Sequence, residues 1–477
     1  MQYITDNWQE MANIFLNVVA ALLAVAAALH ALMSKRDPKS ALGWIAFCLV
    51  LPFIGPLTYL VFGINRVAVA AQVSYQARVP RDDSESIFEP LGSQLRPLSQ
   101  VGESITGLGL RSCDDIQILV NGEACFPAML ADINAAQQRV YCSTYIFLDD
   151  RTGNSMLEAL LAAAARGVDV RIIVDGLGGT AYLPRIVGKL KKSGLDFHFF
   201  NPITLIPPSL HVNLRNHRKI LMVDGNSAFT GGLNLGDRHL VELIENEHRT
   251  RDLHFRFVGK IVDEFECTFL KDWNHCRGIS ESTTYVPSNI NRSESSIWTR
   301  LIPDGPNDDL DKLTELLVGI MSTAKERIWI MTPYFLPSFD LVGALVAAEL
   351  RGVDVRILVP ERTNIHMAHW AALHNLRHIL ARDLKVYLQP APFIHTKAIL
   401  IDKHYSLVGS ANLDPRSLRL NFELVVEIFS ERFASDIESY FKSRLDESTV
   451  LEDAMLVSLP RLLRIRNALA WLFSPYL

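Results

Sequence analysis

Residues 217–224 read HRKILMVD, and a matching stretch, HTKAILID, stands at residues 395–402. Both follow the pattern H-x-K-x4-D. Residues two apart on a β-strand point to the same face, so each histidine should lie beside its lysine. The apolar residues that follow continue the strand into a core, and the aspartate is expected to close the strand at a turn. The pattern therefore predicts two like strands, each presenting one imidazole and one ammonium group.

The repeat extends beyond these stretches. The spacing that separates His217 from His395 also separates Gly231 from Gly409 and Asn234 from Asn412. Two upstream blocks also recur: 139–148 (RVYCSTYIFL) as 327–336 (RIWIMTPYFL), and 166–174 (RGVDVRIIV) as 351–359 (RGVDVRILV). Their β-branched and aromatic residues predict strands, and the Ala/Leu-rich segments before the second block predict helices that end at its glycine.

Each half of the chain thus reads as strand, helix, strand. This alternation predicts an α/β fold with mostly parallel strands in a mixed sheet flanked by helices. We expect two such domains, at residues 111–290 and 291–445, to pack as a pseudo-symmetric pair.

The sequence before the repeats is strongly apolar. Hydrophobic residues make up 49% of the 477-residue chain, and residues 11–33 and 41–62 carry no charge. A stretch of this length can cross a hydrocarbon core of about 30 Å as a helix. A cleaved signal peptide is disfavoured because no Lys or Arg precedes the first stretch. Residues 1–66 are predicted to form a transmembrane hairpin, in which LPFIGP (51–56) kinks the second helix without ending it.

Charges beside the hairpin disagree about its orientation. Lys35, Arg36 and Lys39 favour a cytoplasmic loop by the positive-inside rule, whereas Arg66, Arg78 and Arg81 favour the opposite orientation. The sequence therefore leaves open the side of the membrane that bears the following domains. Residues 67–110 have a mixed, polar composition with several prolines, which predicts a linker.

Charge and cysteine content narrow the class of protein. The chain has 47 basic and 52 acidic residues and a net charge of −5, so it lacks the global positive charge of a nucleic-acid binder. Its six cysteines are scattered without a CxxC pair, which predicts free thiols and no zinc site.

Two histidines and two lysines facing one another can perform phosphodiester chemistry without a metal. The lysines, with Asn234 and Asn412, would hold the non-bridging oxygens as charge builds up. One imidazole would attack phosphorus, and the other would protonate the leaving oxygen. For a single HxK, a surface strand with two basic residues is the plainer interpretation, but two copies in register within a repeat disfavour it.

Over residues 110 to 445 the duplicated pattern resembles the phospholipase D superfamily. Four features are similar to the bacterial cardiolipin synthases of that superfamily: the hairpin with LPFIGP, and the stretches LRNHRK (214–219), GGLNLGD (231–237) and GSANLDPRSLRLNFE (409–423). The resemblance implies a multi-pass protein of the bacterial inner membrane that uses no cofactor, metal or nucleotide. No GxxxxGK[ST] signature occurs in the chain, in agreement with the last point.

The resemblance also implies roles for particular residues. His217 is the expected nucleophile, forming a phosphohistidine, and His395 the expected acid and base. Asp252 and Glu423 are expected to hydrogen-bond the catalytic histidines, although an ion pair with Arg251 is an alternative for Asp252, whose segment reads TRDL where many relatives have WRDT. The expected catalytic set is His217, Lys219, Asp224, His395, Lys397 and Asp402, and the expected substrate-binding set is Asn234, Asn412, Asp252 and Glu423.

Residues 446–477 are predicted to form an amphipathic helical tail. Arg461, Arg464 and Arg466 stand among apolar residues at helical spacing, which suits a helix at the surface of an anionic membrane and equally a helix packed on the core.

The leading functional hypothesis is transfer of a phosphatidyl group from one phosphatidylglycerol to another in the bilayer, giving cardiolipin and glycerol. Hydrolysis to phosphatidic acid by a phospholipase D is the nearest alternative. The hairpin disfavours a nuclease, so no nucleic-acid partner is expected. The intact pairs of charged residues disfavour a catalytically silent lipid-binding scaffold. The sequence is compatible with a homo-oligomer without requiring one.

Overall fold

The computed structural model describes residues 2–35, 38–63, 91–92, 94–178, 184–202, 204–205, 208–209, 214–242, 248–279, 297–306, 311–380, 382 and 384–474. Several sequence predictions fall outside these residues: the charges at Arg36, Arg66, Arg78 and Arg81, most of the linker (67–90), and the domain junction near residue 290. The chain divides into two compact units, Met1–Ala70 and Ala71–Leu477.

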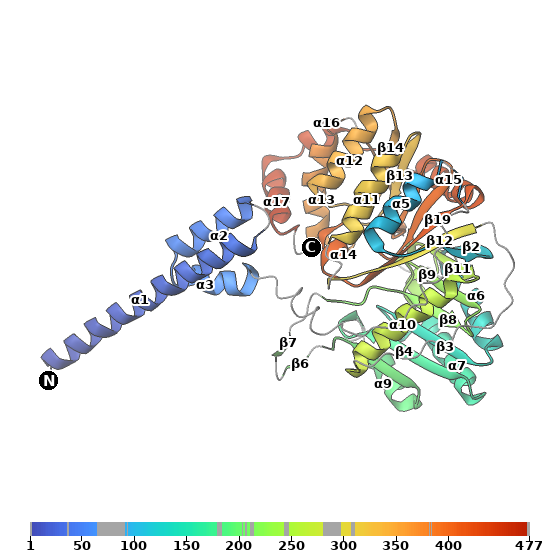
Figure 1. Ribbon diagram of the computed structural model, residues 1–477, viewed down its shortest axis with the longest axis horizontal. Coiled ribbons are helices and arrows are strands. Elements are labelled where there is room, and N and C mark those ends of the chain that lie inside the picture. Colours follow the sequence, from blue (N-terminus) through green and yellow to red (C-terminus); the bar gives the residue numbers. More distant parts are fainter. Residues whose placement is uncertain are drawn as a thin grey trace. The chain divides into compact units, whose positions relative to one another are not determined.

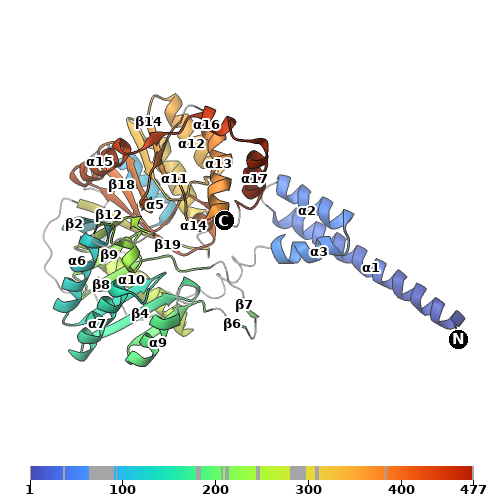
Figure 2. The same cartoon turned by 180° about the vertical axis from the view of Figure 1, so that it is seen from behind.

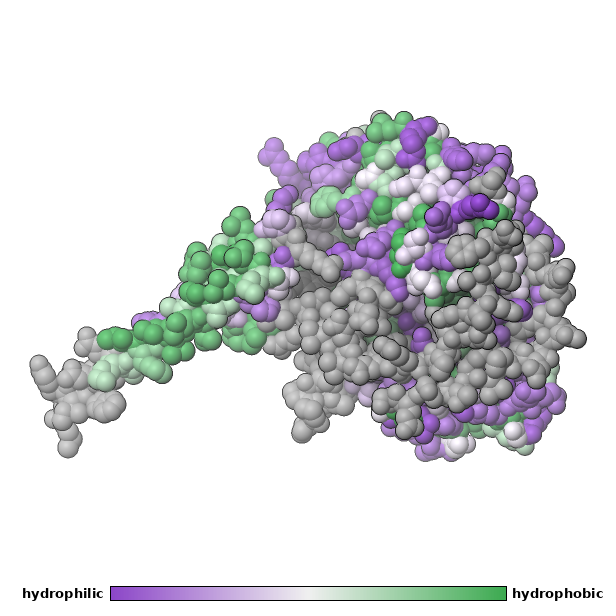
Figure 3. Space-filling view, in the orientation of Figure 1, coloured by the Kyte–Doolittle hydropathy of each residue, from purple (hydrophilic) through white to green (hydrophobic). Residues whose placement is uncertain are grey.

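The N-terminal unit consists of one long helix and a broken apolar segment folded onto it (Figure 1). Helix α1, Gln2–Ser34, contains a span, Met11–Ser34, that is long and apolar enough to cross a membrane. Helix α2, Pro38–Val50, packs beside it, and a small buried cluster of Ala31, Cys48 and Tyr59 joins the segments. Apolar side chains cover much of the face of this unit that Figure 3 shows, among the residues that the structure describes.

The second apolar stretch is not one kinked helix, so that sequence prediction is wrong. Helix α2 ends at Val50, and the chain resumes as α3, Ile54–Thr58, followed by a π-helical turn, η1, Tyr59–Gly63. Pro52 explains the break, because proline has no N–H to donate and its ring clashes with the carbonyl four residues earlier. At about 1.5 Å per residue, α2 is roughly 20 Å long, shorter than a hydrocarbon core of about 30 Å.

The larger unit contains two mixed sheets, one for each repeat (Figures 1 and 2). The first sheet runs in the order β2 (Asp115–Val120), β11 (Leu253–Val258), β9 (Ser227–Gly231), β8 (Ile220–Val223), β3 (Arg139–Thr144), β4 (Asp169–Asp175) and β5 (Asp196–Phe200). The second runs β1 (Arg111–Cys113), β12 (Ile297–Asp304), β19 (Glu423–Phe429), β18 (Tyr405–Gly409), β17 (Ala398–Ile401), β13 (Arg327–Met331), β14 (Asp354–Pro360), β15 (Lys385–Gln389) and β20 (Thr449–Val450).

The mixed α/β architecture is as predicted, but antiparallel pairing predominates in both sheets. In these two sheets, parallel pairing occurs only among β3, β4 and β5 and among β13, β14 and β15. The first two strands of each group come from the recurring upstream blocks, and the third is the next strand of the same sheet. The motif strands β8 and β17 pair antiparallel with β3 and β13. The spacing that relates His217 to His395 also relates both bounds of β8 to those of β17, so the repeat in sequence is also a repeat in structure.

Helices cover both faces of each sheet. The first core lies under α6 (Asn121–Ala135), α7 (Arg151–Ala165) and α9 (Pro184–Ser193), and the second under α11 (Lys312–Thr323), α12 (Phe339–Leu350) and α13 (His366–Leu380). Helices α10 (Ile261–Arg277) and α15 (Glu431–Asp446) take the other faces, where rings on α10 and α15 pack against Tyr141 and Trp329. Gly167 and Gly352 follow α7 and α12 at φ 87° and 88°, as predicted for glycines after a helix end.

The sequence order of the domains is not strictly kept in space. Helix α5, Arg96–Thr106, occupies the end of the predicted linker, and its Leu98 is buried in the second core. Arg300 of β12 donates hydrogen bonds to the backbone oxygens of Ser99 and Leu108, at 3.0 and 2.7 Å. Strand β1, at the start of the predicted first domain, pairs with β12. Residues 96–113 therefore belong to the second sheet and its core.

The predicted C-terminal tail ends in α16 (Asp453–Val457) and α17 (Arg461–Leu472). One face of α17 packs on α13, with Ala470 buried against Ala371. On this face the guanidinium of Arg466 lies 4.3 Å from the ring centre of Trp370. The opposite face exposes an apolar stripe at helical spacing, in which Leu462 is 80% exposed; the stripe comprises Leu462, Ile465, Leu469, Leu472 and the adjacent Phe473. Core packing thus accounts for only one face of the helix.

Candidate active site

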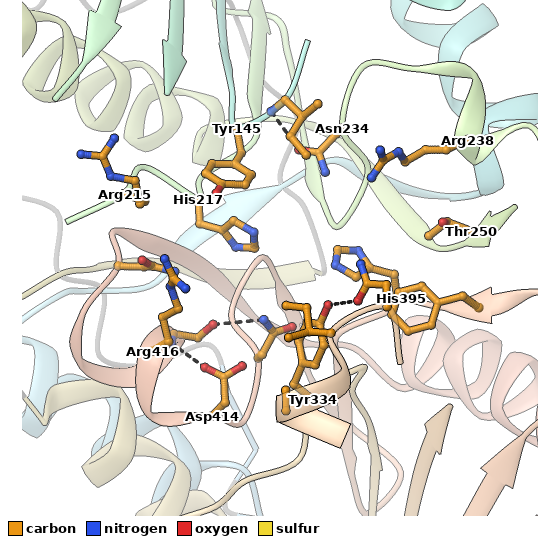
Figure 4. Close-up of a pocket in the computed structure, with 18 of the residues that line it drawn as sticks. Tyr145, Arg215, His217, Asn234, Arg238, Thr250, Tyr334, His395, Asp414 and Arg416 are labelled. Carbon is orange, nitrogen blue, oxygen red and sulfur yellow. Dashed lines mark hydrogen bonds between the residues drawn. The ribbon is translucent and has the colours of Figure 1, made fainter. Parts of the chain in front are cut away.

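A cavity of about 220 Å³ lies between the two repeats and contains both motif histidines (Figure 4). Asn234 and Asn412, predicted to bind substrate, also line it. The structure thus brings together residues that are far apart in the chain, as the duplicated motif predicts. Tyr145, Arg215, Arg238, His239, Tyr334, Asp414 and Arg416 complete much of its polar lining.

Backbone hydrogen bonds between the repeats position the two histidines. The N–H of His217 donates to the carbonyl of Phe422, and the N–H of His395 donates to that of Arg251, at 2.9 and 2.8 Å. The second contact belongs to a short parallel ladder between β10 (Thr250–Arg251) and β16 (Phe393–Ile394). Since Phe422 and Arg251 directly precede Glu423 and Asp252, this pairing brings each acidic residue beside the histidine of the other repeat.

The two carboxylates bind the histidines reciprocally. A Glu423 oxygen lies 3.1 Å from Nδ1 of His217, and Asp252 Oδ2 lies 2.8 Å from Nδ1 of His395. Both carboxylates are fully buried. Arg251, the alternative partner of Asp252, pairs instead with Glu447 at 2.7 Å. With Nδ1 of each ring bound to a carboxylate, Nε2 is the nitrogen available to a substrate.

The two histidine–carboxylate pairs differ in the group that lies beside the carboxylate. Ser410 Oγ donates to Glu423 at 2.6 Å, whereas Gly232 stands at the matching position of the first repeat, where a Cβ would lie 2.2 Å from an Asp252 oxygen. Burial acts to raise the pKa of both carboxyls. For Glu423, the charges of His217 and Lys219 and the bonds from His217 and Ser410 outweigh burial and lower its pKa, while the pKa of Asp252 stays raised. Glu423 is therefore the more firmly anionic partner.

The motif lysines are buried beside the histidines. Lys219 Nζ donates to the carbonyl oxygen of His217 at 2.7 Å and lies 5.8 Å from the ring centre of Tyr145. Lys397 Nζ contacts the carbonyl oxygen of His395 and lies 2.9 Å from its Nδ1. Burial lowers the pKa of Lys219 to about 8 and that of Lys397 to about 7. A phosphodiester bound nearby would favour the charged ammonium form of both.

Burial also disfavours the protonated form of both imidazoles. It lowers the pKa of His217, against the opposing charge of Glu423. It lowers the pKa of His395 well below its usual value, with Lys397 and Lys219 acting in the same direction. A neutral imidazole at His217 has the lone pair that a nucleophile needs.

The motif aspartates do not lie at the cavity. Asp224 accepts hydrogen bonds from the backbone N–H groups of residues 137–139, each at 2.8 Å, and Asp402 does the same for residues 325–327. Both residues have left-handed backbone conformations, at φ 54° and 51°, in the turns after β8 and β17. Their separation from the histidines along an extended chain is roughly 20 Å. These bonds fix the starts of β3 and β13 from the turns that the sequence predicted, and the catalytic role predicted for both aspartates stays a prediction.

The sequence analysis missed several lining residues. Tyr145 packs edge-on against His217, with ring centres 5.0 Å apart, and His239 Nε2 accepts the N–H of Asn234 at 3.1 Å. The spacing that relates Asn234 to Asn412 also relates Arg238 to Arg416, so continuing the repeat a little beyond Asn234 would have identified both arginines. Tyr145 and Tyr334 stand near the ends of the recurring upstream blocks, which was a further usable signal.

Comparison with known proteins agrees with this architecture. A family model described as cardiolipin synthase, PLD-like domain, matches residues 129–273 and 317–445. The chain belongs to this family. A second model, described as phospholipase D-nuclease N-terminal, matches residues 22–63. The resemblance inferred from the sequence motifs is therefore confirmed.

Individual relatives match over nearly the whole chain. Cardiolipin synthase A of Pseudomonas aeruginosa is 33% identical over 468 residues, covering 96% of this chain and 94% of that protein. The major cardiolipin synthase of Bacillus subtilis is 27% identical over 489 residues, covering 97% of each. Among solved structures, the phosphatidylserine synthase of Haemophilus influenzae Rd KW20 has a similar fold, with a TM-score of 0.61 at 16% identity, covering 80% of this chain and all of that one.

The lowered lysine pKa values predict the alkaline limb of the pH profile. The free enzyme should lose kcat/KM about tenfold per pH unit above roughly pH 7 to 8, because neutral amines no longer attract the phosphodiester. The limb in kcat should lie at higher pH, because the bound anion raises the lysine pKa values. Substituting the exposed Lys403→Met should leave both profiles unchanged. A kcat/KM that stays level to about pH 9 would contradict the assigned role of the lysines.

Proposed function

We propose that this site transfers a phosphatidyl group from one phosphatidylglycerol to another, forming cardiolipin and releasing glycerol. The observation that carries the proposal is the reciprocal arrangement of two histidines, each hydrogen-bonded to a carboxylate of the other repeat, around one cavity. Two buried lysines beside them supply positive charge for a phosphodiester. The lipid substrates are those that the names of the full-length relatives imply.

In the first step, Nε2 of His217 attacks the phosphorus of the donor lipid. The bond from phosphorus to the head-group glycerol breaks, and the leaving oxygen takes a proton from Nε2 of His395. The negative charge of the bound phosphodiester opposes the lowering of the His395 pKa, which favours the protonated acid at this step. The products of this step are free glycerol and a phosphatidyl group on His217.

In the second step, a hydroxyl of another phosphatidylglycerol attacks the phosphohistidine. The phosphorus–nitrogen bond breaks, and the hydroxyl proton passes to His395. One phosphodiester is lost and one is formed overall, so the sequence of steps needs no nucleotide.

The asymmetry between the carboxylates supports His217 as the nucleophile. Its ring becomes positively charged as Nε2 bonds to phosphorus, and an anionic partner at Nδ1 stabilises that charge. Glu423, with its lowered pKa and its hydrogen bond from Ser410, is better suited to this task than Asp252.

The roles of the histidines can be separated by trapping. His217→Ala and His395→Ala should each lower turnover by about 10²–10⁴ or more, because neither ring can perform the other's step. Labelled phosphatidylglycerol should leave an acid-labile label on His217 in the His395→Ala protein during long incubation, and no label in the His217→Ala protein. Thermal unfolding of both variants should match the unaltered protein. Label found on His395 of the His217→Ala protein would reverse the roles.

The products distinguish transfer from hydrolysis. Given phosphatidylglycerol alone, the purified protein should form cardiolipin in clear excess over phosphatidic acid. Given cardiolipin and excess labelled glycerol, it should form labelled phosphatidylglycerol, because the two half-reactions run in both directions. Both activities should survive strong chelators, since lysines supply the positive charge. Phosphatidic acid as the main product in both assays would make the chain a phospholipase.

The membrane association of the chain is supported by α1, whose apolar span is long enough to cross a bilayer. We propose the bacterial inner membrane as its location. The prediction of a multi-pass protein stays a prediction, because α2 alone is shorter than a hydrocarbon core.

We propose that the exposed stripe of α17, defined above, contacts the surface of an anionic bilayer. Arg461 is exposed at the start of the helix and Arg464 is partly exposed, so cations flank the apolar side chains, as in helices that lie in a membrane interface. Arg466 does not take part, since it stacks on Trp370. The underlying helix α13 begins beside the cavity, where Ile365 and Ala368 are lining residues.

Glutamates in this stripe should impair action on membranes selectively. In the full chain, Leu462→Glu with Leu469→Glu should lower activity on vesicles of phosphatidylglycerol about tenfold, because a buried leucine contributes roughly 1.5–3 kcal/mol to the contact. Activity on the same lipid dispersed in detergent should change less than about twofold. Leu350→Glu, on an exposed leucine of α12, is the control. An equal loss in detergent, or no loss on vesicles, would contradict the contact.

A further inference from the structure

A second and larger cavity adjoins the site. Its volume is about 640 Å³, against about 220 Å³ for the cavity that contains the histidines. The two cavities share four lining residues, Arg238, Thr250, Asn364 and Phe393, and therefore lie side by side. The second cavity is large enough to hold a ligand group in addition to the phosphate that binds at the histidines.

Positive charge predominates in this second cavity. Arg238, Arg249 and Arg362 line it together with His248, and Glu361 is the acidic residue among its described lining residues. Arg362 is exposed and forms no hydrogen bond or ion pair with any residue in the described ranges. Arg249 donates to the backbone oxygen of Val241 at 3.3 Å, which leaves further N–H groups of its guanidinium. Arginine forks of this kind suit phosphate oxygens.

The opposite side of the site offers less open positive charge. Arg416 is the repeat-related counterpart of Arg238, and Figure 4 shows it with Arg215 on the side of His217, whereas Arg238 and Thr250 lie on the side of His395. Arg215 is almost fully buried and pairs with Asp175 at 3.4 Å. The near-symmetry of the repeats is thus broken, and the larger basic space opens beyond His395.

The direction of the reaction identifies what enters this space. In an in-line displacement, the nucleophile and the leaving group lie on opposite sides of phosphorus. With His217 as nucleophile and His395 as acid, the head-group glycerol departs on the His395 side. The acceptor hydroxyl enters by the same side, since His395 takes its proton in the second step.

We propose that Arg238, Arg249 and Arg362 bind the phosphate of the acceptor, so that the enzyme selects a glycerol phosphate ester over free glycerol or water. This inference rests on the proposed function and names the acceptor subsite within it. In phosphatidylglycerol, the reacting hydroxyl and the phosphate stand at opposite ends of one glycerol. An acceptor whose hydroxyl lies at His395 therefore places its phosphate in the adjoining cavity.

This subsite gives a physical reason for transfer to predominate over hydrolysis. Water competes for the phosphohistidine but has no group to fill the second cavity. The non-reacting phosphate of the acceptor contributes binding energy that orients its hydroxyl, and that orientation raises the rate of the second step. In the reverse reaction, the second phosphate of cardiolipin occupies the same place.

The test compares acceptors that differ only in the phosphate. The full chain receives phosphatidylglycerol as donor and either labelled glycerol or labelled glycerol 3-phosphate as a soluble acceptor, and cardiolipin is measured in parallel. Arg362→Ala and Arg249→Ala should each reduce the preference for glycerol phosphate over glycerol about tenfold, and should reduce the ratio of cardiolipin to phosphatidic acid by a similar factor. Arg362→Lys should recover part of the preference. Arg377→Ala, at an exposed arginine near the end of α13, is the matched control.

The outcomes separate the inference from the proposed function. If the unaltered protein forms cardiolipin, and the acceptor ratios are the same in the Arg362→Ala and Arg249→Ala proteins, the subsite is overturned and the function stands. If Arg416→Ala alone abolishes the preference, the acceptor enters on the His217 side and this assignment is overturned. If the unaltered protein forms phosphatidic acid and no cardiolipin, the proposed function fails and the subsite fails with it.

Discussion

The active site depends on hydrogen bonds that cross between the repeats. Each histidine takes its carboxylate partner and a backbone hydrogen bond from the other repeat, so neither repeat contains a complete site. Buried ionisable groups are costly unless paired, and these groups are paired only when the repeats are packed together. Arg218 reinforces that packing, because it binds Asp272 of its own repeat at 2.6 Å and the carbonyl oxygens of Glu423 and Asp304 at 2.9 Å. Catalytic geometry and domain packing are therefore one constraint.

Duplication supplies two similar half-sites, but the chemistry requires different tasks of them. The differences are small and local: Glu423 against Asp252, and Ser410 against Gly232. The pKa of Glu423 is lowered chiefly by His217 and Lys219, with a smaller contribution from the Ser410 hydroxyl, whereas burial keeps the pKa of Asp252 raised. On a larger scale, a second cavity of about 640 Å³ adjoins the site and shares Arg238 and Thr250 with it, on the side of His395. Under the proposed mechanism, a nearly symmetric scaffold would place a nucleophile on one side and an acid with an acceptor space on the other.

The local features of the site were predictable from sequence. The HxKx4D spacing correctly predicted that the apolar part of each motif is a strand, and β8 and β17 keep the same spacing along the chain as the two motif histidines. The histidines and lysines were predicted to lie on these strands, but they precede them, at residues 217–219 and 395–397. Which repeat each acid serves was not predictable, because it depends on the packing of β10 against β16 and of Phe422 beside residues 215–217, far apart in the chain. The motif aspartates close the turns after β8 and β17, as the sequence predicted. Their place in a repeated motif suggested catalysis, which stays a prediction, and a carboxylate that accepts three backbone N–H groups at a turn also has a structural reason to recur. For β1 and α5, local pattern could not reveal that they join the sheet of the later repeat.

Helix α13 joins the chemistry to the surface of the larger unit. Its N-terminal end contributes Ala368 to the cavity, directly after Asn364 and Ile365 in the preceding loop, and its outer side supports α17 through Trp370 and Ala371. A lipid substrate has to leave its acyl chains in an apolar environment while its phosphate reaches the histidines. The same rigid helix borders the phosphate site and carries the exposed apolar stripe, so the depth at which the stripe lies in a bilayer would set the height of the cavity relative to the head groups. Since α17 packs on α13 and α13 borders the cavity, a shift of the stripe by one helical turn, about 5.4 Å, would shift the cavity relative to the phosphates if the helices move together. The packing of α17 on α13 thus links the exposed stripe to the helix that borders the cavity, and under the proposed membrane contact it would position the site at the head groups.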